Sequence, residues 1–227
     1  MTRRPRQGNC VYCGAEGDVT RDHVPPSCLF PPEDRINLIT VPACAECHES
    51  FKLDDEYFRV TLSLRADLDS GAATEFIRAQ TAKTLSDPKA AKFREAISAA
   101  RTRIAIHSPA GIYLGEQDAL KIDGPRIRRF ARRNIFGLYR KFFRQPLPQN
   151  YDLSVTLMDW QTNDSAIRHP EVVEVLTLLG RHGQHKRFGS VVDIWCMKAD
   201  DDEHASIWSL TLHGAFGFVA YTVPRDA

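Results

Sequence analysis

Two pairs of cysteines near the start of the chain constrain its fold more than any other feature of the sequence. Cys10 and Cys13 form one Cys-x-x-Cys pair, Cys44 and Cys47 form the other, and residues 14–43 lie between them. Each pair can form a knuckle that directs two thiolates at one ion, and tetrahedral Zn²⁺ takes four such ligands. Without a secretory signal ahead of them, cysteines paired in this way favour a metal site over disulfides. We therefore expect a structural zinc ion.

A four-thiolate zinc site has no open coordination position, so this ion would hold shape and perform no chemistry. It would join the ends of a hairpin to the start of a helix. The surrounding segment is so small and proline-rich that we expect it to be disordered without the metal. The other two cysteines, Cys28 and Cys196, have no partner at metal spacing, and we expect both to be buried as small apolar side chains.

The composition of the chain is that of an ordinary globular protein. It has 227 residues, of which 43% are apolar and 26% charged, and its net charge is only +1. Overall charge therefore gives no indication of a nucleic-acid partner. The basic start of the chain is not followed by an apolar stretch, and no run of about eighteen apolar residues occurs. We expect no targeting segment, no membrane partner and a cytoplasmic location.

The order of the expected elements indicates an α+β fold in two parts. Residues 1–66 are predicted to form the zinc-stapled module, and residues 67–227 an accessory region that positions the substrate, with a helical segment and then a mixed α/β part. Helices are expected from residue 45 onward and over 72–106, 126–144 and 171–179. Strands are expected over 37–42, 104–106, 119–122, 153–158, 191–197, 207–212 and 216–223. The stretch around His182 and His185 is expected to be a glycine-rich loop.

A second group of polar residues, within and beside the cysteine pairs, can carry chemistry. Asp22 and His23 are adjacent, Asn37 follows in the same loop, and His48 comes directly after the last cysteine. Hydrolysis of a phosphodiester needs a base near neutral pH, and the imidazole of His23 can serve because it titrates at about pH 6.5 when unperturbed. A divalent cation offsets the charge that gathers on the phosphate oxygens, and a hard cation prefers an oxygen ligand such as Asp22. His48, on the first turn of the following helix, would be the second ligand.

The order of these residues resembles that of the HNH endonucleases, whose fold is the ββα-metal module. The matching positions are Cys10-x2-Cys13, Asp22-His23, Asn37-Leu38 and Cys44-x2-Cys47-His48, with Lys52 behind them. The order is also similar to that of zinc-containing resolvases of the endonuclease VII type. The resemblance covers roughly residues 8–60. It implies a nuclease that uses Mg²⁺ or Mn²⁺, with Asn37 orienting His23 and with Lys52 close to phosphate.

Each of these residues also has a plainer interpretation. His23 could simply cap the zinc hairpin. His48 could be an exposed helix residue, or it could compete with the cysteines as a zinc ligand. Asn37 could be an ordinary turn residue, and Lys52 a solvated surface residue.

A basic and aromatic helix is the best candidate for contact with nucleic acid. Residues 1–60 hold seven Lys or Arg and ten Asp or Glu, so affinity for phosphates would have to come from elsewhere. The helix expected over 126–144 carries no acid, and five of its arginines fall on roughly one face. They are Arg126, Arg129, Arg133, Arg140 and Arg144. The alternative is an amphipathic helix whose charged face is solvated and whose other face covers an aromatic core.

These observations predict a metal-dependent endonuclease, with DNA favoured over RNA as its partner and with structural Zn²⁺ beside a catalytic Mg²⁺ or Mn²⁺. A homodimer would suit double-strand cutting. Two other classes of protein stay open. One is a non-catalytic, zinc-stabilised module that binds nucleic acid, and the other is a structural zinc protein with a protein partner. The complete set of Asp22, His23 and His48 favours the enzyme, because a binding module has no need of all three.

Overall fold

The N-terminal part of the chain forms a small sheet that leads into a long helix. The computed structural model describes residues 6–108, 110–159 and 170–225. Three antiparallel strands, in the order β1-β2-β3, precede α1. Their bounds are β1 Arg6–Asn9, β2 Glu16–His23, β3 Thr40–Cys44 and α1 Ala45–Ser63, and two 3₁₀ turns, η1 Ser27–Leu29 and η2 Pro32–Arg35, connect β2 to β3. The prolines of that connection keep it from forming a longer helix.

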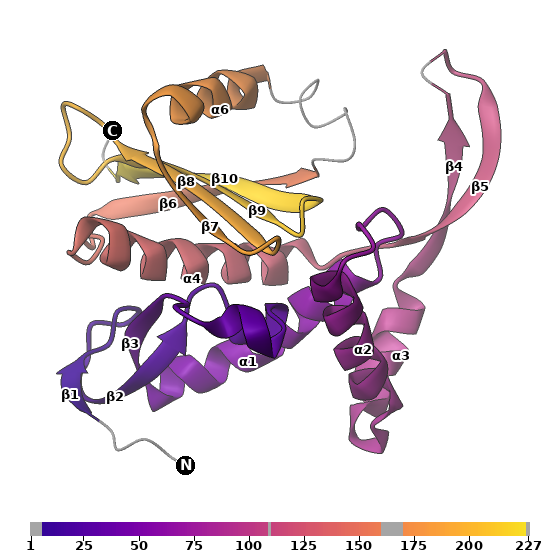
Figure 1. Cartoon of the computed structure of the whole chain (residues 1–227), viewed down its shortest axis with the longest axis horizontal. Coiled ribbons are helices and arrows are strands. Elements are labelled where there is room, and N and C mark those ends of the chain that lie inside the picture. Colours follow the sequence, from indigo (N-terminus) through magenta and orange to yellow (C-terminus); the bar gives the residue numbers. More distant parts are fainter. Residues whose placement is uncertain (1–5, 109, 160–169, 226–227) are drawn as a thin grey trace.

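A pair of helices and a two-stranded arm come next. Helix α2 spans Ala72–Ser86 and α3 spans Ala91–Ala99, with the 3₁₀ turn η3 (Pro88–Ala90) between them. Strands β4 (Arg101–His107) and β5 (Tyr113–Leu120) pair antiparallel in a sheet of their own. This arm projects away from the rest of the molecule (Figure 1).

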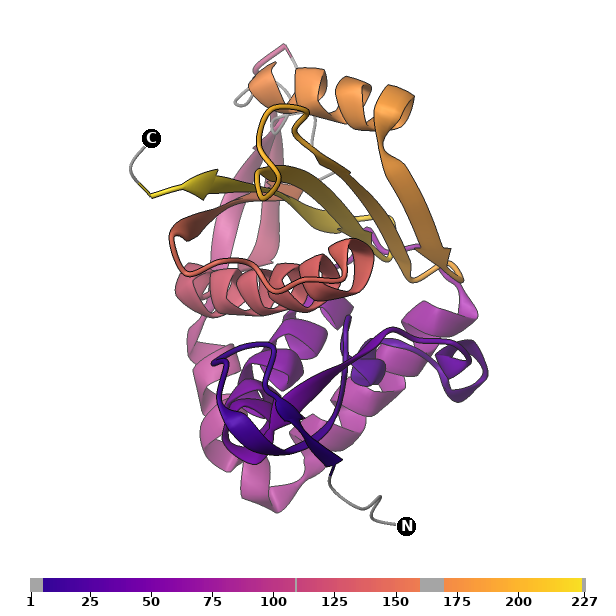
Figure 2. The same cartoon turned by 90° about the vertical axis from the view of Figure 1, so that its left-hand side faces the viewer.

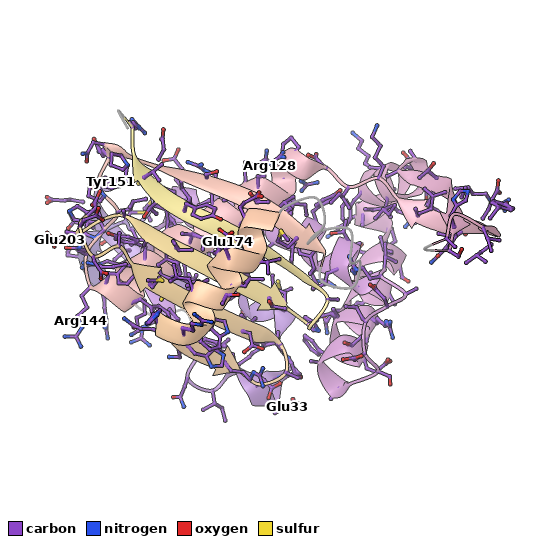
Figure 3. All side chains as sticks on the ribbon, turned by 90° about the horizontal axis from the view of Figure 1, so that it is seen from above. Glu33, Arg128, Arg144, Tyr151, Glu174 and Glu203 are labelled. Carbon is purple, nitrogen blue, oxygen red and sulfur yellow. The ribbon has the colours of Figure 1, made fainter. Side chains whose placement is uncertain are left out.

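The C-terminal part is an antiparallel sheet covered by one helix on each face. The strand order is β6-β10-β9-β8-β7, and α4 lies against one face while α6 lies against the other (Figures 1 and 2). Figure 3 looks onto α6, which carries the exposed Glu174 above the strands. The bounds are α4 Gly124–Phe143, β6 Tyr151–Asp159, α6 Pro170–His182, β7 Gln184–Phe188, β8 Val192–Lys198, β9 Ser206–Leu212 and β10 Phe216–Pro224. The fold is therefore mixed α+β, as expected.

One hydrophobic core joins the two predicted parts of the chain. Helix α4 lies between the C-terminal sheet and the N-terminal module (Figure 2). The rings of Phe58 on α1 and Phe130 on α4 stack with centroids 3.8 Å apart. Gly137 of α4 lies so close to the module that a Cβ there would come within 2.6 Å of Val24. A single cluster of buried residues includes Val24 and Phe58 of the module together with Trp208 of the sheet. The predicted boundary at residue 66 is thus not a break in the core.

Two local predictions need correction. The stretch around His185, expected to be a loop, is strand β7, which pairs with β8. Phe188 at its end is buried, and the four polar residues before it are exposed. The strand expected from residue 37 begins only at Thr40, because Asn37 has a positive φ of 66° and cannot continue an extended strand. Among the helices that the structure describes, none has the length and hydropathy needed to cross a lipid bilayer.

Candidate metal centre and adjoining cavity

The four paired cysteines converge as the spacing predicts. Their sulfur atoms all lie within 4.8 Å of one another, and the sulfurs of Cys13 and Cys44 are 3.8 Å apart. Four thiolates at about 2.3 Å from a tetrahedral Zn²⁺ would be separated by similar distances. Gly14, with φ of 76°, closes the first knuckle by donating its N–H to the carbonyl of Cys10. The backbone N–H of Cys47 donates to the sulfur of Cys44 at the start of α1. These cysteines can bind a metal ion such as zinc.

Asp22 is buried in a network of hydrogen bonds near the end of β2. Its carboxylate accepts a 2.6 Å hydrogen bond from the hydroxyl of Tyr12 and two from Arg133 Nη2, at 2.7 Å to Oδ1 and 2.8 Å to Oδ2. Arg133 reaches this position from α4, with its guanidinium 4.7 Å from the centre of the Phe51 ring. A second nitrogen of Arg133 pairs with Asp55 of α1. One buried cation therefore bridges the buried carboxylate of Asp22 and the half-buried carboxylate of Asp55.

Burial and these ion pairs act in opposite directions on the pKa values of Asp55 and Arg133. Burial raises the pKa of Asp55 to about 7, although the neighbouring Arg133 acts to lower it. Burial alone would lower the pKa of Arg133, but Asp55 and Asp22 outweigh it and raise that pKa above its ordinary value. Arg133 is therefore held firmly as a cation.

His48 approaches the same carboxylate from the first turn of α1. Its Nε2 is 3.7 Å from Asp22 Oδ1 and its Nδ1 is 3.3 Å from the hydroxyl oxygen of Thr20. A proton on Nδ1 shared with Thr20 would leave the lone pair of Nε2 directed toward Asp22. Ligand atoms at about 2.1 Å from one ion can be up to about 4.2 Å apart. Asp22 Oδ1 and His48 Nε2 thus fit as two ligands of one cation.

His23 ends strand β2 and is half-buried beside Asp22. Burial lowers the pKa of its imidazole from the ordinary value, and Arg35, His48 and Arg21 act in the same direction, while Asp22 opposes them. A lowered pKa keeps the ring neutral at pH 7, which is the form that can accept a proton.

A cavity of about 320 Å³ brings these residues together. Asp22 and His23 line it from β2 and Arg133 lines it from α4. Helix α1 contributes residues at helical spacing along one face, so that its wall extends about 16 Å at about 1.5 Å per residue. They are His48, Lys52, Asp55, Glu56 and Arg59.

Asn37 does not join the other candidate residues. It lies in the exposed turn before β3 and, among the described residues, it is not one of those that line the cavity. Its left-handed backbone conformation is one that asparagine adopts more readily than most residues. The structure therefore favours the plainer interpretation of a turn residue. Lys52 does line the cavity, and it also pairs with Glu49 one turn away on α1.

The arginines of α4 do not form one surface for phosphates. Arg126 and Arg129 both pair with Asp54 of α1, at 2.9 Å and 2.8 Å, and Arg133 pairs with Asp22 as described above. These arginines form ion pairs because the N-terminal module carries more acidic than basic residues, and α4 packs against it. The expectation that the five arginines present one face therefore needs correction, and their contact with nucleic acid stays a prediction.

The last two arginines of that set are exposed and remote from the cavity. Arg140 donates a hydrogen bond to the backbone carbonyl of Arg144. Arg144 lies at the end of the molecule away from the β4–β5 arm (Figure 3).

Sequence reasoning missed the buried partners of the site. Tyr12 lies within the first cysteine knuckle and donates directly to Asp22, but no pattern in the sequence marks it as a site residue. The sequence pattern predicts a phosphate-binding face for Arg133, which instead pairs with Asp22. The charge distribution does indicate this pairing, because an acid-rich module attracts a basic helix that carries no acid. Arg59 also lines the cavity, and nothing in the sequence pattern of its helix indicates that this arginine is buried there.

Comparisons with protein-family models, with curated proteins and with solved structures find no match to this chain.

Proposed function

We propose that the protein is a metal-dependent endonuclease of the HNH type, which hydrolyses phosphodiester bonds in nucleic acid, in DNA rather than RNA. The observation that carries the proposal is the convergence of Asp22, His23 and His48 on one cavity next to the four-cysteine site. These residues come from β2 and α1, and the four cysteines lie just before β2 and at the junction of β3 with α1, where a bound zinc ion would join them.

Four residues of the cavity have proposed roles that follow from their positions. His23 accepts a proton from the attacking water. Asp22 and His48 hold a divalent cation, Mg²⁺ or Mn²⁺, which when bound supplies positive charge to the phosphate oxygens. Arg133 keeps the Asp22 carboxylate in place through its two hydrogen bonds. The four cysteines hold zinc and take no part in the reaction.

Replacement of His23 by alanine is expected to slow cleavage by about 10²- to 10⁴-fold, the usual contribution of a general base. The measurement is nicking of plasmid DNA, single-stranded DNA and RNA by zinc-loaded protein with Mg²⁺ or Mn²⁺. The control is His182→Ala, which removes an exposed imidazole at the end of α6. Equal nicking by wild type and His23→Ala would rule out this role, and no cleavage by either would refute the proposed activity.

One observation favours a second candidate, a zinc-stabilised module that binds nucleic acid without cutting it. Both oxygens of Asp22 already accept hydrogen bonds, from Tyr12 and Arg133. If these hydrogen bonds prevent Asp22 from binding a divalent cation, the module would bind nucleic acid but would not cleave it. The same experiment separates the two candidates, because the binding module retains its affinity in His23→Ala and shows no metal-dependent cleavage. A structural zinc protein would show no salt-dependent affinity for nucleic acid at all.

A further inference from the structure

Arg59 lines the part of the cavity far from the cysteines, and its buried positive charge has only a distant, partly exposed acid as a partner. The side chain of Arg59 is only 7% exposed. Its guanidinium donates hydrogen bonds to the neutral hydroxyls of Thr81 and Thr84, at 3.0 Å and 2.8 Å. Its ion-pair partner among the described residues is Glu56, at 4.0 Å, with a side chain that is 41% exposed. Buried charges in proteins are normally paired more closely than this.

The contrast with Arg133 shows what is missing at Arg59. Burial lowers the pKa of Arg59, and the nearby Cys28 and Glu56 do not offset it. Carboxylates raise the pKa of Arg133 instead. Both guanidinium groups line the same cavity. Arg59 therefore has capacity left for an anion that enters the cavity.

An aromatic ring and a second arginine line the same cavity as Arg59. Phe76 of α2 is half-buried and lines the cavity, with the guanidinium of Arg35 5.5 Å from the centre of its ring. Gln80, one helical turn further along α2, also lines the cavity. We call Arg35, Arg59, Phe76 and Gln80 the distal subsite. A stacked arginine and aromatic ring form a surface on which an unpaired nucleotide base can stack.

We propose that the distal subsite binds one unpaired nucleotide next to the phosphodiester bond that is cleaved. Arg59 contacts its phosphate, and its base stacks on the layer formed by Arg35 and Phe76. This inference rests on the proposed function and adds to it a substrate class, single-stranded nucleic acid. Residues of α2 and η2 line the cavity together with residues of β2 and α1, and a base that binds inside such a cavity must leave its stack. That step costs least in a strand that is already unpaired.

The test compares the affinity of the zinc-loaded, full-length protein for a fluorescent single-stranded oligothymidylate and for a duplex of equal length, by anisotropy without added Mg²⁺ or Mn²⁺. We expect the single strand to bind about tenfold more tightly, and we expect Arg59→Gln and Phe76→Leu each to remove most of that preference. The matched controls are Lys92→Gln, which removes one exposed positive charge on α3, and Phe93→Leu, which removes a half-buried ring on α3. Both controls lie outside the cavity lining and should keep the preference.

The ratio of single-strand to duplex affinity is the decisive quantity, because a purely structural role of either residue would not change it. Equal affinity for both ligands in the wild type would overturn the proposal, and so would a ratio in Phe76→Leu that matches the wild type. If Arg59→Gln does not fold, Phe76→Leu decides alone. Selective single-strand binding without any cleavage would refute the nuclease but support the subsite. Cleavage of duplex and single strand at equal rates would refute the subsite but leave the nuclease intact.

Discussion

Substitution of Cys47 by serine is expected to abolish stoichiometric zinc binding and to unfold the N-terminal module. Structural zinc sites contribute about 10–16 kcal/mol to the folding of small zinc-binding peptides, which is comparable to or larger than the total stability of an ordinary domain, about 5–15 kcal/mol. Cys47 lies on the first turn of α1 and belongs to the cluster that joins this helix to the knuckle of β1 and β2. Its loss leaves three thiolates and removes that connection.

The measurement is the zinc content per chain together with thermal unfolding followed by circular dichroism. Cys28→Ala is the matched control, because Cys28 lies in the connection between β2 and β3 and outside the cluster. The control should retain one zinc per chain. A Cys47→Ser protein that retains one tightly bound zinc and the thermal midpoint of the wild type would show that the four cysteines are not the structural site.

Replacement of Arg133 by alanine is expected to lower the free energy of unfolding by about 3–5 kcal/mol, the cost of leaving a buried charge without its partner. Arg133 is 4% exposed and Asp22 is 2% exposed, so little of the lost interaction is offset by hydration of the Asp22 carboxylate in the folded state. The Asp55 carboxylate loses its partner in the same substitution. The effect should therefore lie at the upper end of what a single residue contributes.

Urea denaturation of the zinc-loaded protein measures this loss. Arg128→Ala serves as the control, since Arg128 is on the same helix but exposed at the surface (Figure 3), and it should change the stability by less than about 0.5 kcal/mol. Similar stabilities of the two variants would mean that Arg133 does not hold Asp22 and Asp55 in solution.

Contacts could be predicted from the sequence where the residues are close together in the chain or belong to a motif of fixed spacing, such as the two Cys-x-x-Cys pairs. The four cysteines converge because each knuckle is local and one ion requires both. Asp22 and His48 meet because Asp22 lies next to the last residue of β2, while His48 follows Cys47 in the first turn of α1. The helix α4 and the strands β8 to β10 also follow directly from the spacing of their apolar residues.

The contacts that sequence reasoning missed join parts of the chain far apart in sequence. Arg133 binds a carboxylate 111 positions away, and no local pattern specifies which of the ten acids of the module it chooses. The same holds for α2, whose Phe76 and Gln80 form a wall of the cavity only because α2 packs against α1. Strand β7 could not be predicted from the sequence, because four of its five residues are exposed and it lacks the alternation of apolar and polar residues typical of a strand.

Asp22 and His48 are proposed to hold a catalytic cation, and substitution of His48 tests this role most directly. Its side chain is 39% exposed, whereas that of Asp22 is 3% exposed, so His48→Ala should leave the fold intact. The measurement is the initial rate of cleavage of a single-stranded oligonucleotide as Mn²⁺ is titrated into zinc-loaded wild type and His48→Ala. We predict a saturable Mn²⁺ dependence in the wild type that is lost, or moved to much higher Mn²⁺ concentration, in the variant. Identical titration curves, or no cleavage by the wild type at any Mn²⁺ concentration, would contradict the claim.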